Sequence, residues 1–90
     1  MRPDDICEKY FKIKPRPKLT ISIDKSMVLI EGKAEALKFL GELLIAQSRY
    51  EDDCSFFISP KGAGYGFFAK ESTKGVYIHR LPCLEKKRNR

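Results

Sequence analysis

The chain has 90 residues, of which 42% are hydrophobic and 33% are charged, and its formal net charge is +6 at pH 7. This length fits one small domain, and the composition is too apolar for a wholly disordered chain. No apolar run approaches the ~20 residues that a membrane-spanning helix needs, so we expect no membrane segment. Residues 1–5 are not followed by an apolar stretch, so we expect no secretory signal.

The positive charge lies at the two ends of the sequence. Residues 1–18 contain six basic and three acidic side chains, and residues 85–90 contain four basic and one acidic side chain. Residues 19–84 contain eight of each sign. Nucleic-acid-binding domains usually carry a basic stripe on the folded surface instead. We therefore expect residues 85–90 to be a solvated basic tail that attracts RNA or DNA only weakly and in a salt-sensitive way.

Residues 1–18 are predicted to be a basic lead-in to the domain. Two prolines within residues 14–18 remove backbone donors and favour an extended chain. In residues 6–13, apolar side chains recur four and three positions apart, which fits a short helix docked on the domain. The same stretch could equally form an edge strand.

A β-hairpin is predicted next. Residues 19–23 alternate apolar and polar side chains, which is typical of a half-buried strand. Residues 27–31 form a second strand after the short turn at residues 24–26, and such a short connection indicates a hairpin. The second strand is apolar on both faces, which predicts a more central position in a sheet than the first.

Residues 33–49 are predicted to form the long helix. Its charged side chains after Lys33 are Glu35, Lys38, Glu42 and Arg49. They form a narrow stripe, so the apolar face is wider than the roughly 100° that packing on a sheet requires. Either the N-terminal segment or a second copy of the chain would cover the rest. Gly41 costs about 1 kcal/mol relative to alanine in a helix, which suggests close backbone approach at this position.

Two further strands are predicted in the second half of the chain. They cover residues 54–59 and 76–81, each ended by a proline, and a glycine-rich turn at residues 61–66 follows the first of them. The order strand, strand, helix, strand, strand predicts an α+β domain over residues 19–84. We expect a mainly antiparallel four-stranded sheet with the long helix packed on one face.

The cysteine pattern favours a reducing cytoplasm. Cys7, Cys54 and Cys83 are an odd number, lie far apart and form no CxxC pair. Cys7 could pair with Cys83 if the chain ends lie close together, although nothing requires it. His79 with scattered cysteines is a weak metal signal, because zinc sites normally use four converging ligands. We therefore expect no metal and no cofactor.

No group of residues predicts catalysis. Residues 62–66 lead into two phenylalanines rather than a helix and lack the lysine and serine or threonine of a P-loop, so we expect a mobile turn. The single histidine, His79, has no nucleophile motif and no paired carboxylates beside it. We therefore predict that the protein is not an enzyme.

Aromatic side chains around the glycine-rich turn form the candidate binding surface. Aromatic residues are favoured as interface anchors, and with basic neighbours they also stack on single-stranded bases. Packing over the open face of the sheet would use them equally well. The candidate partner-binding residues are Lys61, Tyr65, Phe67, Tyr77 and His79.

A wider pattern spans residues 28–81. Residues 28–37 form a strand, a glycine and a helix start, and the helix continues with Leu40, Leu43 and Leu44. A short strand, the glycine-rich stretch and a final apolar strand follow. This order resembles the immunity protein 32 family of bacterial polymorphic toxin systems. The resemblance implies a non-enzymatic cytoplasmic protein that neutralises a cognate toxin by occlusion with a complementary surface.

Two other functions stay open from the sequence. The basic ends and exposed aromatic side chains fit a small nucleic-acid-associated protein, whose binding would be salt-sensitive. The wide apolar helix face fits a structural or regulatory homodimer joined through the helix or a sheet edge. For a toxin partner, the neutral residues 19–84 argue against mimicry of a nucleic acid. They allow a toxin with an acidic surface, or an interface dominated by shape.

Overall fold

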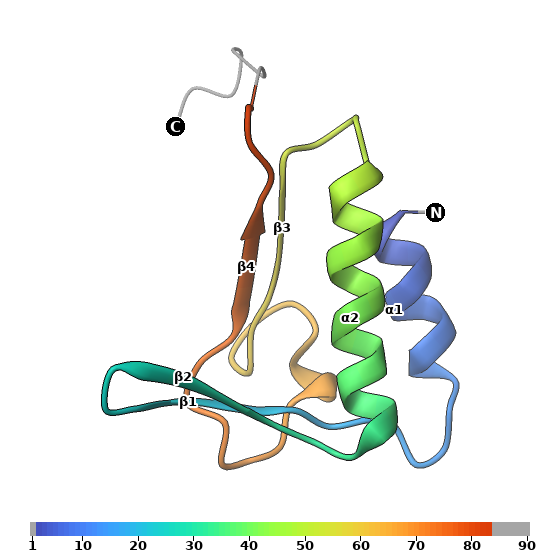
Figure 1. The fold of residues 1–90 in the computed structure, drawn as a ribbon. Coiled ribbons are helices and arrows are strands. Elements are labelled where there is room, and N and C mark those ends of the chain that lie inside the picture. The colour runs from blue at the N-terminus through green and yellow to red at the C-terminus, as the bar shows by residue number, and fades with distance from the viewer. Residues whose placement is uncertain (1, 84–90) are drawn as a thin grey trace.

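A computed structural model describes residues 2–83 and is shown as a ribbon in Figure 1. The predicted basic tail at residues 85–90 lies outside the described residues. The elements in chain order are α1 (Pro3–Phe11), β1 (Thr20–Asp24), β2 (Met27–Glu31), α2 (Ala34–Arg49), β3 (Ser55–Ile58), the 3-10 turn η1 (Tyr65–Phe67) and β4 (Val76–His79). The α+β class and the predicted order strand, strand, helix, strand, strand are confirmed. Within the described range, neither α-helix is long and apolar enough to cross a membrane.

The predicted four-stranded sheet is wrong, because the strands form two separate antiparallel pairs. In the first pair, β1 and β2 are joined by a two-residue turn between Asp24 and Met27. In the second pair, β3 and β4 run from the Ser55–His79 pair to the Ile58–Val76 pair. Figure 1 shows that the two ladders cross rather than continue one another.

A loop lies along the free edge of β1. The backbone N–H of Ile21 donates to the Ser72 hydroxyl at 2.8 Å, and the Ile21 carbonyl accepts from the Lys74 N–H at 3.0 Å. Leu19 forms an isolated bridge with Phe68 on the same side. The outward backbone groups of Leu19 and Ile21 are thus paired with residues 67–74 and are not available to β3.

Helix α1 settles the ambiguity of the N-terminal segment in favour of a helix. Pro3 stands at its first position and the Asp5 carboxylate accepts the Arg2 N–H at 3.0 Å, both of which favour a helix start. Tyr10 packs its ring on Phe39 of α2 with centroids 5.2 Å apart. The N-terminal segment is therefore one cover of the wide apolar face of α2, as one of the two alternatives predicted.

A charged cluster fixes α1 against α2. The Glu42 carboxylate accepts from the Lys9 ammonium and from the Tyr10 hydroxyl, each at 2.8 Å. These two hydrogen bonds hold the pKa of Glu42 below its ordinary value. Burial, and then the hydrogen bond to Glu42, raise the pKa of Tyr10 to about 12. The tyrosine therefore stays a hydrogen-bond donor at any physiological pH.

The core lies between the two helices, β1 and the turn η1. Its residues are Ile6, Tyr10, Leu19, Ile21, Ala36, Phe39, Leu40, Leu43, Ala46, Ile58, Phe67 and Phe68. The ring of Phe67 stacks on Phe39 with centroids 4.3 Å apart. Gly41 faces away from this core. A methyl group at Gly41 would meet no atom within 4 Å, so the predicted close approach of another element of the chain is wrong.

Candidate partner-binding surface

The β1–β2 hairpin exposes apolar side chains in a row, and its turn points away from both helices in Figure 1. All five residues of β2 are exposed. The large apolar side chains exposed on the hairpin are Ile23, Met27, Val28, Leu29 and Ile30. The predicted central position of β2 is therefore wrong. Apolar side chains on both faces of a strand indicate that the strand is buried. The pattern does not show whether the same chain or a second protein buries it.

The outer edge of β2 also leaves backbone groups available for pairing. Asp24 and Met27 close the two-residue turn as a hydrogen-bonded pair, and such pairs alternate along an antiparallel ladder. Consequently, the N–H and C=O groups of Val28 and Ile30 point away from β1. Within residues 2–83, no strand pairs with this edge. Proteins usually protect an open edge with charge, proline or a bulge, and the stretch from Met27 to Ile30 has neither charge nor proline.

A second exposed apolar area lies on the outer face of β3 and β4. Phe57 and Tyr77 are register partners, with ring centroids 5.8 Å apart, and are 57% and 71% exposed. His79 follows Tyr77 on the same face, because side chains two positions apart share a face of a strand. This pair is the part of the predicted aromatic surface that the fold does assemble.

The remaining predicted contact residues lie elsewhere. Lys61 and Tyr65 are exposed on the loop before and at the start of η1, and among the described residues Tyr65 makes no ring contact with Tyr77. Phe67 is only 3% exposed and belongs to the core, so it offers no surface to a partner. Sequence reasoning missed β2 and Phe57 as surface residues. The signal was present in the uninterrupted apolar run of β2.

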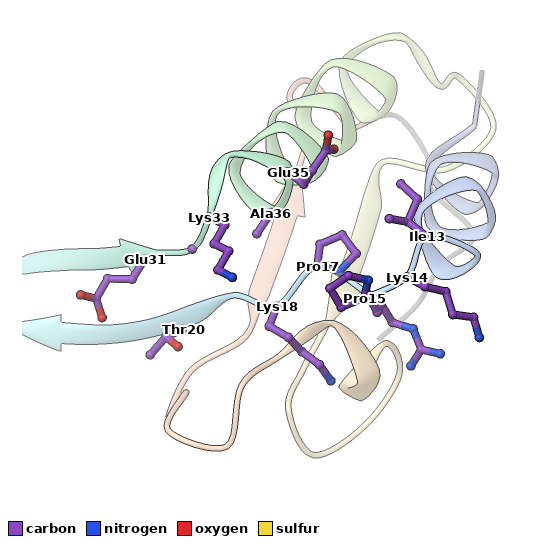
Figure 2. A pocket seen from close by; sticks show the side chains of 12 residues that line it. Ile13, Lys14, Pro15, Pro17, Lys18, Thr20, Glu31, Lys33, Glu35 and Ala36 are labelled. Atoms are coloured by element: carbon purple, nitrogen blue, oxygen red, sulfur yellow. The ribbon is translucent and has the colours of Figure 1, made fainter.

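A pocket of about 600 Å³ opens between the segment before β1 and the start of α2. Figure 2 shows the rings of Pro15 and Pro17 on one side of it, with Lys33 and Ala36 on the other. Its basic lining residues are Lys14, Arg16, Lys18 and Lys33, and its acidic ones are Glu31 and Glu35. The pocket can attract an anionic group. Its described lining holds no histidine, cysteine or serine that could act on one.

Two of these cations already have partners inside the protein. The Lys18 ammonium donates to the Gly66 carbonyl at 2.9 Å. The Arg16 guanidinium lies 3.8 Å from the centre of the Phe11 ring. Both contacts tie the linker to the body of the domain. Two of the four basic side chains that line the pocket therefore have a structural role. The exposed strand β2 is the stronger candidate for a functional surface.

The cysteines differ from the expected lone thiols. Cys54 and Cys83 form a disulfide with Cα atoms 5.6 Å apart, so neither the three free thiols nor the Cys7–Cys83 pairing holds. Pairing follows from the fold, and spacing alone does not fix it. Cys7 is free, and its pKa is raised to about 11, first by burial and then by the nearby Asp4 carboxylate. At neutral pH it is a protonated thiol of low reactivity.

No protein-family model, curated protein or solved structure matches this chain.

Proposed function

We propose that the protein is a non-enzymatic binding module whose partner docks on β2. The observation that carries this proposal is that all five residues of the strand are exposed and four of them are large and apolar. Fully burying one such side chain stabilises a complex by about 1.5–3 kcal/mol. Larger contiguous apolar patches on a protein surface commonly mark an interaction site.

The open edge suggests how the partner binds. A strand of the partner can add to β2 through the free backbone groups of Val28 and Ile30, which gives affinity without requiring a particular sequence. Side chains on both faces of the hairpin then select the partner by shape. The charges beside the strand balance, since Asp24 and Lys25 precede it and Glu31 and Lys33 end it. We therefore infer an interface dominated by apolar contact.

The resemblance to the immunity protein 32 family supports a bacterial toxin as the partner and the cytoplasm as the compartment. In this mechanism, the module binds the cognate toxin tightly and covers the surface that the toxin uses on its own target. The complex needs no chemistry from the module, since occlusion alone removes the activity.

The second candidate is a homodimer through the same edge, and one observation favours it. Antiparallel pairing of β2 with its own copy about Val28 would place Met27 opposite Leu29 of the second copy. The free backbone groups of Val28 would face those of Val28 in the second copy in this register. Apolar side chains would thus face each other across the two-fold axis, as suits an isologous interface.

Co-expression with the protein encoded by the neighbouring gene tests the proposal. We expect the neighbour to arrest growth alone, and the module to restore growth and co-purify with it. Val28→Pro is the sharpest variant, because the Val28 N–H points away from β1 and its loss leaves the hairpin ladder intact. It should abolish rescue.

Ile45→Lys, on the exposed side of α2, is the control and should rescue like the wild type. A neighbour that is harmless, or that stays lethal beside the wild-type module, refutes the toxin partner. Rescue by Val28→Pro would refute docking on this edge. Light scattering of the purified chain distinguishes the homodimer, which Val28→Pro would convert to a monomer.

A further inference from the structure

Three side chains that can bind metals converge at one end of the β3–β4 pair. The sulfurs of Cys54 and Cys83 and a ring nitrogen of His79 all lie within 4.8 Å of one another. Cys54 is buried directly before β3, and His79 is the exposed last residue of β4. Cys54 and Cys83 are 29 positions apart in the sequence, so the fold has brought Cys54 to the other two residues.

Backbone pairing holds two of the three ligands in place. Ser55 and His79 are register partners, and the Arg80 N–H donates to the Cys54 carbonyl at 2.8 Å. The backbone around Cys54 and His79 is therefore fixed by the ladder. Cys83 follows on the segment that leaves β4. A preorganised site of this kind loses little entropy when it binds an ion.

Two thiolates and one imidazole are a ligand set for zinc. Zinc is bound at about 2.3 Å by sulfur and about 2.0 Å by histidine nitrogen, usually in a tetrahedron. Two sulfurs in such a site lie roughly 3.8 Å apart, which rotation of the two cysteine side chains can reach once they are no longer bonded. Since the three atoms lie within 4.8 Å of one another, small rotations of the side chains would bring all of them to bonding distance of one ion.

We propose that Cys54, His79 and Cys83 bind one Zn²⁺ ion when the Cys54–Cys83 disulfide is reduced, with water as the fourth ligand. A dithiol reductant supplies two electrons and two protons, which break the S–S bond and yield two thiols while the reductant becomes a disulfide. Zinc then displaces both thiol protons and bonds to the two thiolates and the neutral imidazole. The resulting centre carries no net charge.

The site gives the end of the ladder a cross-link in either redox state. The β3–β4 pair has only four residue pairs, and an isolated two-stranded pair is marginally stable. In an oxidising medium the disulfide ties Cys83 to the strand that follows Cys54. In a reducing one, such as the cytoplasm, zinc takes over the same connection. This inference does not depend on the identity of any protein partner.

Competition between the full-length chain and a chromophoric zinc chelator measures the binding. We expect the reduced chain to take up one Zn²⁺ with release of protons, and the oxidised chain to take up none. Zinc at about 100 times its Kd should raise the Tm of the reduced chain by on the order of 10 °C. Absence of zinc uptake by the reduced chain overturns the proposal.

Variants separate this site from adventitious binding. Cys83→Ser and His79→Ala should each lose more affinity than the about 10- to 100-fold typical of losing an outer-shell partner. His79 is exposed, so His79→Ala keeps the fold even where Cys83→Ser does not. Cys7→Ser is the matched control, because it removes a thiol outside the cluster and should bind like the wild type. Binding by His79→Ala equal to that of the wild type refutes the three-ligand site.

Discussion

Ile21 and Ile30 face each other across the β1–β2 hairpin, yet only one of them is buried. The two are register partners, but Ile21 is 3% exposed and Ile30 is 41% exposed. Ile21→Ala removes buried methyl and methylene groups and leaves a cavity in the core, so we expect a loss of about 3 kcal/mol in the free energy of unfolding. Ile30→Ala removes a side chain that water already reaches, so we expect a loss of about 1 kcal/mol.

Urea unfolding followed by far-UV circular dichroism measures both values, with the slope m unchanged if only stability is affected. The difference between two neighbouring isoleucines is the informative quantity, because their chemistry and secondary structure match. Equal losses for both variants would refute the exposed state of β2 in the free chain. Repeating the measurement at a much higher protein concentration would then show whether a second copy buries Ile30.

Three further predictions address the core, the helix pair and the second ladder. Phe67→Ala should lower the free energy of unfolding by about 3–5 kcal/mol, because Phe67 is buried. Tyr65→Ala should change the free energy of unfolding by less than about 0.5 kcal/mol, because Tyr65 is exposed, and a larger loss of stability would contradict that exposure. Because the pKa of Glu42 is lowered from 4.5 on folding, the stability it supplies is full above that pH and is lost as the pH falls through the folded value. Glu42→Gln should therefore flatten the decline of Tm below pH 4.5, and an unchanged profile would refute the contribution of the Lys9–Glu42 pair. Gly75→Ala should disrupt the β3–β4 pair, since the added methyl would overlap backbone atoms of residues 58 and 59, and an unaltered circular dichroism spectrum and Tm would contradict that packing.

The unprotected edge of β2 connects the fold to the proposed function. A free strand edge with apolar side chains invites aggregation unless a partner or a second copy covers it. The same hairpin would thus be a liability in isolation and an anchor in a complex. The chain alone should therefore be less soluble than the chain in complex with its partner.

The disulfide and the proposed zinc site bear on the same question of compartment. The odd number of scattered cysteines favours a reducing cytoplasm, whereas the fold brings two of the three together as the Cys54–Cys83 disulfide. A reducing compartment and the observed disulfide are compatible if Cys54 and Cys83 are disulfide-bonded in one state and bind zinc in the other. Zinc uptake by the reduced chain would make a cytoplasmic location compatible with a tied C-terminal segment.

The sequence by itself determined the local structure. Period-two alternation placed β1, the apolar run placed β2, and the leucine-rich stretch placed α2, because these patterns depend only on which side chains share a face. Spacing of four and three at Ile6, Tyr10 and Ile13 allowed a helix, but a strand remained possible. In the folded chain residues 3–11 are helical, and the ring and hydroxyl of Tyr10 contact Phe39 and Glu42 of the second helix.

Tertiary structure decided how these elements pair. The edge of β1 is occupied by Ser72 and Lys74, polar loop residues that no periodicity connects with a strand more than forty positions away. The two ladders stay apart, and the outer edge of β2 is open within the described residues. Cys54, His79 and Cys83 meet at the end of the other ladder. Long-range pairing depends on competition among all available donors and acceptors in the folded chain, and a local pattern carries no record of that competition.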